Sequence, residues 1–449
     1  MPILLEGPSS PDDELSFQAR LARHHFSAGV VQLFLKIVLS CAATQRATAA
    51  VLDLIAPWLP GVEEAPCANT GRMWLLRLGL YELTREKEKA DDWVWIMDHT
   101  IQLGPWKCLV IVGLRLSAWS KDRGPLCHED LTLLTLTPME QATGERVHQA
   151  MVETIDVTGI PRQIVSDGGT DLKKGMELLH EKHPEVAHIH DIKHKTALLL
   201  KKELEHNEQW MAFVTQSNKA KLGMTQTTLA CLVPPSLKTK ARYMNLDTLV
   251  AWGGNILQYL DSPPTDPKAK VDLVKLEEKC GWVREFRGPL QEWSELLTVA
   301  GTAEQYIREE GYHSAARAAL EQRLALLATT AGAERMSAAV LEVVANESAA
   351  AKPNNERLLG SSEVLESLIG KYKQMQSTHS KGGMTAMLLS FGAIVSEKTH
   401  ETIRAALDTV QTSQIGKWCC KELGVTLQSQ RKRAFVGNKN GIRNDDESG

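Results

Sequence analysis

The sequence has no apolar run as long as those found in membrane proteins. No run reaches the roughly 18 residues that a membrane-spanning helix needs. The first residues, MPILLEGPSSPDDEL, also lack a basic start followed by an apolar stretch and a cleavage site. We therefore expect a soluble protein that is not secreted.

The sequence also has no closely spaced cysteine pairs of the kind that bind zinc. Its eight cysteines include no Cys-x-x-Cys pair, and only Cys419 and Cys420 lie close together in the chain. This pattern excludes a zinc knuckle and a disulfide framework. Scattered thiols of this kind are typical of a reducing cytosol.

An overall excess of positive charge is missing as well. The formal net charge is -4 and the pI is about 6.4, which argues against a protein that coats nucleic acid by bulk charge. The basic residues are nevertheless grouped, and each group is either a local phosphate-binding patch or a solvated helix face. The groups are Lys193, Lys195, Lys201 and Lys202; Lys219 and Lys221; Lys238, Lys240 and Arg242; and Lys371, Lys373 and Lys381.

The chain is long enough for several domains with proper hydrophobic cores. It has 449 residues, of which 43% are hydrophobic and 24% charged, and a prior of roughly 150 residues per domain suggests about three domains. Residues 1–90 are predicted to form a helical N-terminal domain, because leucine and alanine recur at helical spacing between prolines.

The segment from Cys67 to Leu83 is a candidate recognition helix. Asn69 and Thr70 are possible caps at its start, and apolar residues follow at helical spacing. In a helix-turn-helix domain, the start of such a helix would bring Asn69, Thr70, Arg72 and Arg77 near DNA. A small helical bundle without a ligand is the alternative.

A sheet is predicted after residue 91, where the hydrophobic pattern changes. The segments 92–103, 106–116 and 131–139 are dense in β-branched and aromatic residues and indicate adjacent strands. Helices are expected over 144–159, 171–184 and 193–206, with strands at 162–169 and 185–192 between them. The order βββαβαβα predicts a mixed α/β sheet and is that of the RNase H-like fold.

The remaining chain is predicted to be mainly helical. We expect a first part of the core over 91–206, an all-α insertion over 207–354, and a return to the core over 355–426. That return includes an amphipathic helix from Glu363 to Met375 and a Gly-Gly turn at Gly382 and Gly383. The basic and polar residues 427–449 are expected to form a flexible tail.

Two acidic residues are predicted where strands end, the edge at which α/β sheets collect ligands. Asp98 follows the apolar run in DWVWIMD, and Asp167 closes IVSDGG just before two glycines. Such residues also cap helices or make turns. Phosphodiester transfer requires carboxylates that hold two divalent ions about 4 Å apart, and hard oxygen ligands select Mg²⁺ or Mn²⁺.

At these residues the sequence resembles DDE transposases of bacterial insertion sequences and their hAT and Mutator-like relatives. The resemblance runs from about Asp92 to Met384 and implies that Asp98 and Asp167 are the first two acids. Asp191 and His194 in HDIKHK are similar to the motif that precedes a helical insertion. GSSEVLES with the later KGGM resembles the motif of the third acid, which matches Glu366. One extra residue in this stretch leaves Glu363 as an alternative.

The resemblance implies a DNA transposase that uses Mg²⁺ or Mn²⁺ bound by Asp98, Asp167 and Glu366. It would cut at transposon ends and transfer the freed 3' hydroxyl into target DNA, acting on double-stranded DNA as a homodimer or larger oligomer. Lys371 and Lys373 join the N-terminal residues as predicted DNA contacts. A bacterial, nucleoid-associated location in the cytoplasm is expected. The alternatives are a catalytically inactive DNA-binding protein and an RNase H-like nuclease without strand transfer.

Two further groups of residues have simple structural interpretations beside functional ones. The histidines between His180 and His194 suggest zinc, but without a cysteine among them a scaffold role is the simpler prediction. Four tryptophans of the helical block would suit stacking on an unpaired base, although buried core positions are the commoner outcome. These are Trp210, Trp252, Trp282 and Trp293.

Overall fold

The computed structural model describes most of the chain and divides it into two compact units. The described residues are 24–59, 62, 64–103, 106–119, 126–237, 243, 245–263, 271–353, 356–377, 384–424 and 434–435. The first unit comprises Met1–Val186 with Ser362–Gly449, and the second comprises Ala187–Ser361. The predicted Gly-Gly turn and nearly all of the predicted tail lie outside the described residues. In the described part no helix is both long and apolar enough to cross a membrane.

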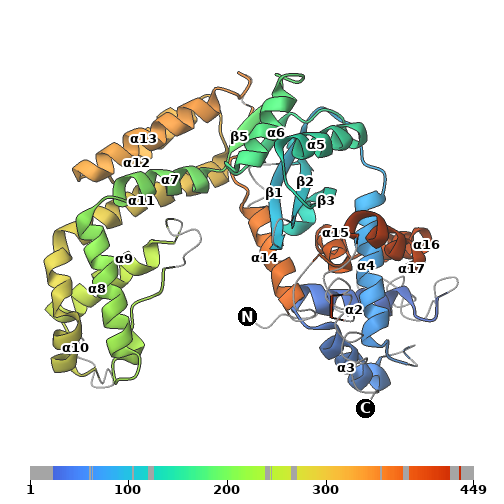
Figure 1. Ribbon diagram of the computed structural model, residues 1–449, viewed down its shortest axis with the longest axis horizontal. Helices are drawn as coiled ribbons and strands as arrows, with labels where there is room; N and C mark the ends of the chain where they lie inside the picture. The colour runs from blue at the N-terminus through green and yellow to red at the C-terminus, as the bar shows by residue number, and fades with distance from the viewer. Residues whose placement is uncertain are drawn as a thin grey trace, which may run out of the picture. The chain divides into compact units, whose positions relative to one another are not determined.

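A five-stranded mixed sheet confirms the predicted α/β class (Figure 1). Its order is β3-β2-β1-β4-β5; β2 pairs antiparallel with β1 and with β3, whereas β4 runs parallel to β1. The predicted alternation of strands and helices is confirmed from β1 to α7. The bounds are β1 Trp93–Leu103, β2 Trp106–Arg115, β3 Thr132–Met139, α5 Gly144–Thr158, β4 Gln163–Ser166, α6 Thr170–His180, β5 Ala187–His190 and α7 Ile192–Leu204.

One face of this sheet is covered by α5 and α6. Trp95 and Met97 of β1 are fully buried in a cluster with Met151 of α5 and Leu179 of α6. Val94 and Ile96, which alternate with them along the strand, are equally buried on the other face. The sheet is therefore covered on both sides, which explains why its strands are almost continuously apolar in sequence.

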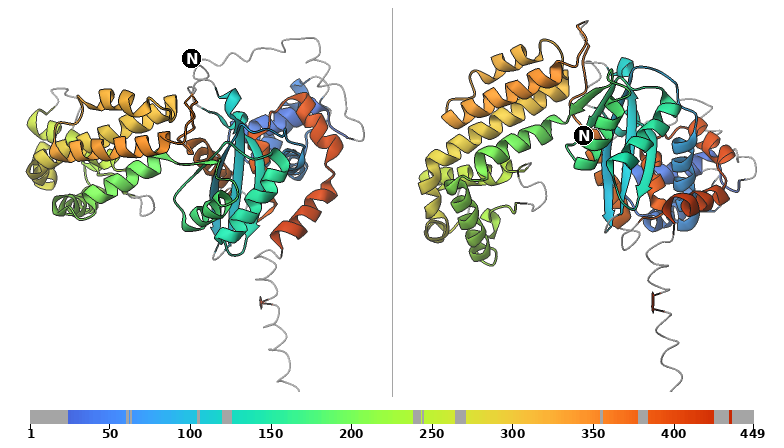
Figure 2. Two further views of the ribbon diagram at one scale, coloured as in Figure 1. Left: turned by 90° about the horizontal axis from the view of Figure 1, so that it is seen from above. Right: turned by 45° about the horizontal axis from the view of Figure 1, so that its top comes forward.

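Helices from the two ends of the first unit pack together beside β1 and β3 (Figure 2). Helix α14 contacts β1, whereas α4 and α15 contact β3 and each other. The helix predicted from Glu363 to Met375 is confirmed as α14. The bounds are α2 Ala28–Ser40, α3 Gln45–Ile55, α4 Ala68–Thr84, α14 Glu363–Ser377, α15 Ser390–Val395, α16 His400–Thr409 and α17 Thr412–Trp418.

Helix α4, the predicted recognition helix, is the buried centre of this helical layer. It contacts α2, α3, α15, α16 and α17, and Leu75, Leu76 and Leu78 are almost completely buried on it. A helix packed on so many sides has little free surface with which to enter a DNA groove. Its exposed polar residues lie at its two ends, Asn69 in the first turn and Thr84 at the last position. Cys67, and neither Asn69 nor Thr70, occupies the N-cap position.

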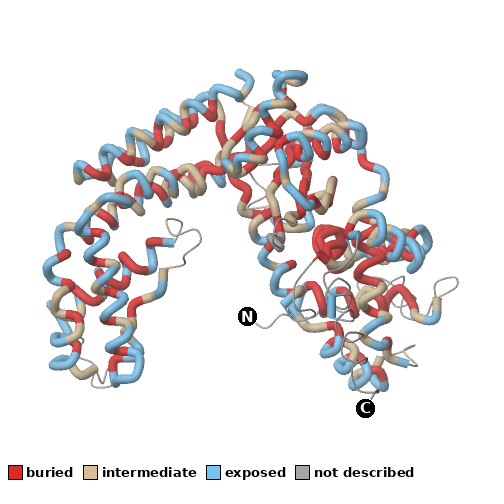
Figure 3. The backbone as a smooth tube through the Cα atoms, in the orientation of Figure 1, coloured by how far each residue is buried: buried red, intermediate tan, exposed pale blue. Residues whose placement is uncertain are grey.

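The second unit contains β5 and the all-α segment predicted from the sequence. Its helices after α7 are α8 Glu208–Met224, α9 Asp247–Asp261, α10 Leu273–Cys280, α11 Arg287–Glu310, α12 Ala316–Leu324 and α13 Ala331–Ser348. Their buried residues recur along the inner sides of the helices (Figure 3). The unit begins at Ala187, twenty residues before the predicted start of the insertion at 207.

Aromatic side chains form the core of this second unit. Phe213 has no exposed surface, and its ring centre lies 5.3 Å from those of Phe286 and Trp293. Trp210, Trp252 and Trp293 are buried, and Trp282 is half-buried with its indole N–H bound to the Lys279 carbonyl. The structure thus places these tryptophans in a hydrophobic core and not on a surface where bases could stack.

Candidate active site

Asp98 and Asp167 lie at equivalent positions on the parallel strands β1 and β4. The pairing of these strands ends with Met97 opposite Ser166, so the next residue on each is an aspartate. Because side chains alternate along a strand, Asp98 shares the face of Ile96 and Asp167 continues the face of Val165. Both carboxylates therefore belong to the face opposite α5 and α6.

The position of Asp98 within its strand differs from the prediction. Strand β1 continues to Leu103, and Asp98 pairs with Val110 of β2 in mid-strand. The strand end that matters belongs to β4, which stops at Ser166 beside the middle of β1. The long antiparallel pairing with β2 extends β1 beyond its short parallel neighbour, and a pattern of apolar residues does not reveal this.

Backbone N–H groups fix both carboxylates. The amide of His99 donates to Asp98 Oδ1 at 2.6 Å, and the amide of Gly169 donates to Asp167 Oδ1 at 3.0 Å. The second bond is the local turn that a strand-ending aspartate commonly makes. It does not remove Asp167 from the site, since the residue is half-buried and lines the same cavity as Asp98.

The lining of that cavity, of about 240 Å³, includes five residues that the sequence analysis did not name as site residues: His99, Thr100, Lys107, Gly169 and Asp171. Asp171, in the first turn of α6, has Oδ2 2.9 Å from Lys107 Nζ and 3.0 Å from His99 Nε2. One carboxylate thereby connects α6 to both β1 and β2. The sequence offered one signal for Asp171, its position two residues after Gly169 in IVSDGGTD, and none for Lys107, which comes from a different strand.

Electrostatics stabilise Asp171 in its ionised form. Burial alone would raise the pKa of this carboxyl, but the hydrogen bond from Lys107, the attraction of His99 in its protonated form and the charge of Lys107 outweigh it and lower the pKa. For His99, burial is the main cause of a lowered pKa, and Asp171 only partly opposes it. The site thus favours an ionised Asp171 and disfavours a charged His99.

A buried polar side chain without a hydrogen-bond partner belongs to a residue that lines the same cavity. Thr100 is 2% exposed, and its hydroxyl has no hydrogen-bond partner within the described ranges. A buried hydroxyl without a partner costs free energy, so a ligand oxygen or water would stabilise it. With Asp98 and Asp167 the cavity offers the hard oxygen donors that Mg²⁺ and Mn²⁺ prefer.

The two candidate third acids lie on α14, the helix that packs against β1. Glu363 and Glu366 are both half-buried in its first turn. Across the residues that the structure describes, no three or more histidine, cysteine, aspartate or glutamate side chains form a group able to hold a metal ion. Asp98 and Asp167 are brought together, and the participation of Glu366 stays a prediction.

The predicted DNA contacts at the front of the chain have unequal surroundings. Asn69 is exposed, and Thr70 and Arg72 are half-buried at the start of α4. Arg77, in contrast, is buried and donates from Nε to the Val410 carbonyl at 2.6 Å and from Nη2 to the Leu407 carbonyl. The prediction for Arg77 is therefore corrected, because its guanidinium joins α4 to α16.

Asp191 and His194 form a local structural motif in the second unit. Asp191 caps α7, accepting a hydrogen bond from the His194 amide at 3.0 Å, while His194 Nδ1 lies 3.2 Å from the same oxygen. Nearby, His190 Nδ1 lies 3.0 Å from Glu347 of α13. These contacts give His190 and His194 a scaffold role.

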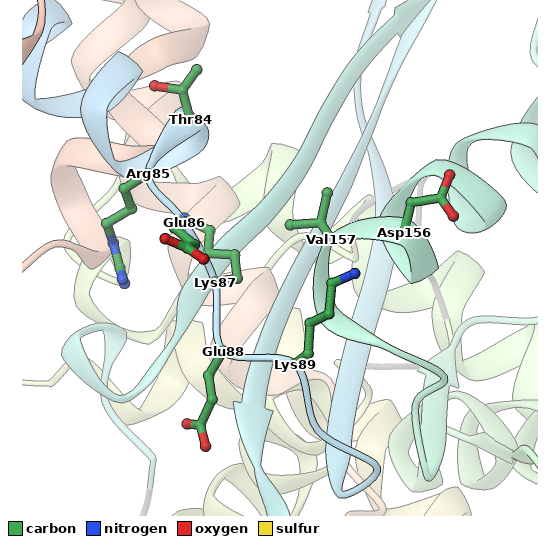
Figure 4. A pocket seen from close by; sticks show the side chains of 8 residues that line it. All are labelled: Thr84, Arg85, Glu86, Lys87, Glu88, Lys89, Asp156 and Val157. Carbon is green, nitrogen blue, oxygen red and sulfur yellow. The ribbon is translucent and has the colours of Figure 1, made fainter.

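A larger cavity, of about 640 Å³, lies away from the two aspartates (Figure 4). Its lining combines the segment Thr84–Lys89 with Asp156 and Val157 of α5. The lining has three basic and three acidic side chains and so no net charge to select an ion. Lys87 is held by Glu82, a residue outside the lining. We therefore place the candidate active site at the smaller cavity.

Comparison with known proteins shows a loose likeness to solved structures. No protein-family model and no curated protein matches the chain. Solved structures do match, among them the "Drosophila P element transposase strand transfer complex", with 10% sequence identity and a TM-score of 0.41. That match covers 83% of this chain and 92% of the other. A likeness of this degree carries no argument about activity, which has to come from the site itself.

Proposed function

We propose that this chain is a metal-dependent DNA transposase of the DDE type, which cuts DNA strands and joins them to a target. The observation that carries the proposal is the parallel register that makes Asp98 and Asp167 neighbours on one face of the sheet. Two carboxylates brought together in this way are suited to hold divalent ions against a phosphodiester.

The side chains at the site fit Mg²⁺ or Mn²⁺ in chemical kind. Asp98 and Asp167 would hold the ions, which when bound activate the attacking oxygen and stabilise the leaving one. His99 and Gly169 orient the carboxylates through their backbone amides. Asp171 fixes the start of α6 against β1 and β2 through His99 and Lys107.

The phase of α14 favours Glu366 over Glu363 as the third acid. Val364, Leu365 and Leu368 belong to its buried side. At about 100° per residue, Glu363 projects nearly opposite the centre of that side, whereas Glu366 lies closer to its edge. Ser367 lies near the opposite edge of the buried side of α14, where it contacts His128 of η4 (His128–Asp130). Glu366 thus lies on the side of the helix turned away from η4.

A cleavage assay tests the proposal directly. DNA carrying the flanking ends of the gene is incubated with Mg²⁺ or Mn²⁺ and with the wild type, Asp98→Asn, Asp167→Asn, Glu366→Gln or Glu363→Gln. We expect the first three substitutions each to lower the cleavage rate roughly 100-fold or more, and Glu363→Gln to leave it within a few-fold of the wild type.

The matched control is Asp156→Asn, which removes an exposed carboxylate on α5 of the same unit. Equal activity of all these variants would refute the proposed site. DNA binding without cleavage by the wild type would instead identify a DNA-binding protein, and cleavage without joined products would identify a nuclease. Mass measurement on the DNA complex would test the proposed dimer or larger oligomer.

A further inference from the structure

A second cavity of the first unit, of about 340 Å³, lies beside the later turns of α14. One wall consists of Ser367, Lys371 and Gln374, which share one side of that helix. The rest of the lining comes from the end of α2 with the residues that lead into α3, from His128 of η4 and from Met375 of α14. None of the residues of the candidate active site lines this cavity.

Lys371 is the unbalanced charge of the cavity. It is half-buried, and within the described part of the chain no carboxylate lies within ion-pair distance of it. Glu129, the acid that partly offsets its charge, is paired with Lys398 at 2.7 Å. Burial and, secondly, the charge of Lys398 lower the pKa of Lys371. A bound anion would offset both effects, because its negative charge stabilises the ammonium group.

The other polar groups of this cavity can donate hydrogen bonds to an anion. Ser40 and Ser367 offer hydroxyls, and Gln374 offers an amide. His128 Nε2 lies 3.2 Å from Ser367 Oγ, and burial together with Lys371 lowers the pKa of this histidine. No acidic side chain lines the cavity, whereas three aspartates line the candidate active site.

We propose that this cavity binds a phosphate group, with Lys371 as its cation and Ser367, Gln374 and Ser40 as hydrogen-bond donors. The proposed function suggests the source, a backbone phosphate of the DNA substrate. Lys371 follows Glu366 by five residues, which at 1.5 Å and about 100° per residue is about 7.5 Å along α14 and about 140° around it, so the two side chains leave different sides of the helix. The site would therefore take a phosphate of the bound DNA other than the reacting one.

The test measures DNA binding by fluorescence anisotropy in EDTA, so that no metal-dependent step contributes. Single- and double-stranded oligonucleotides are titrated with the wild type, Lys371→Met and Lys371→Arg across a range of salt concentrations. The control is Lys36→Met, an exposed lysine of α2 that does not line the cavity. A second arm titrates inorganic phosphate and follows the ring resonances of His128 in the wild type.

If DNA supplies the phosphate, Lys371→Met weakens DNA binding about 5- to 20-fold and lowers the salt slope by about one, while Lys371→Arg and Lys36→Met stay within about 2-fold of the wild type. If free phosphate is the ligand, it shifts the His128 resonances at millimolar concentration and DNA binding is unchanged by the substitution. The absence of an effect in both arms would overturn the proposal.

This test is independent of the cleavage assay. A chain that cuts no DNA can still lose phosphate or DNA binding with Lys371→Met, and the inference then stands while the transposase proposal fails. The converse outcome is cleavage that depends on Asp98 and Asp167 while Lys371→Met binds DNA normally and phosphate leaves the His128 resonances unchanged. That outcome would support the transposase proposal and reject the phosphate site. The His128 arm uses the wild-type chain and so does not depend on the folding of a variant.

Discussion

Asp98 and Asp167 are neighbours because each follows the last residue of the parallel pair Met97 and Ser166. Their separation is thus set by the register of the sheet and not by flexible side chains. The two carboxylates belong to segments almost seventy positions apart in sequence.

We predict that Mg²⁺ raises the melting temperature of the wild type and that Asp98→Asn or Asp167→Asn abolishes this rise. An ion that binds only the folded state adds about 1.4 kcal/mol to the free energy of unfolding for each tenfold excess over its Kd. Differential scanning calorimetry at increasing Mg²⁺ measures the shift. Asp156→Asn should retain it, and an undiminished rise in both site variants would contradict metal binding there.

Asp171→Ala should lower the free energy of unfolding by about 1–3 kcal/mol at pH 7, because Lys107 and His99 lose their shared partner. The pKa of Asp171 is lowered in the folded state, so its contribution is present above the unfolded pKa of about 3.9 and is lost as pH falls through the folded pKa. Urea unfolding from pH 7 to pH 3 should show the two proteins converging in acid. A constant difference across that range would count against the ionised pair.

Gly79→Ala should destabilise the first unit strongly. A Cβ at Gly79 would lie 1.7 Å from the Leu389 carbonyl oxygen of η8 (Ala386–Leu389), and one at Gly392 would lie 2.4 Å from the Gly79 oxygen. Backbone cannot move aside as a side chain can, so we expect a loss of about 2–4 kcal/mol. Gly416→Ala on α17, with nothing within 4 Å, should instead be neutral or stabilising. Thermal unfolding compares them.

Phe213→Ala should cost the second unit about 3–5 kcal/mol, since this fully buried ring packs against several aromatic side chains. Met211→Ala, at a position 49% exposed on the same helix, should change stability by less than about 0.5 kcal/mol. Tryptophan fluorescence during urea unfolding reports on this core. Normal stability of Phe213→Ala would mean that the aromatic cluster is not the core of the unit.

Arg77→Met should lower stability by about 1–3 kcal/mol, because two carbonyl groups of the α16 region lose their donor. Its DNA affinity, measured on protein that is still folded, should equal that of the wild type. Arg72→Met, half-buried at the accessible start of the same helix, should show the opposite pattern of weaker DNA binding and little loss of stability. A reversal of these results would restore Arg77 as a DNA contact.

Local patterns in the sequence determined the kinds and order of the main elements. Dense β-branched and aromatic runs predicted β1, β2 and β3, and helical spacing predicted α5, α6, α7 and α14, because these elements bury apolar side chains with a fixed period. The same patterns identified Asp98 and Asp167 as polar residues beside apolar strands. Each of these features depends on residues close together in the chain.

Only the tertiary structure decided which distant residues meet. Lys107, Asp171 and His99 come from three elements, and Arg77 bonds to carbonyls more than 300 positions away. Helix α4 resembled a surface helix in sequence, yet α2, α3, α15 and α16 cover it. The period of hydrophobic residues indicates which side chains are buried, but it does not indicate which residues cover them. The covering residues come from segments far away in the sequence, and the packing between such segments leaves no periodic pattern.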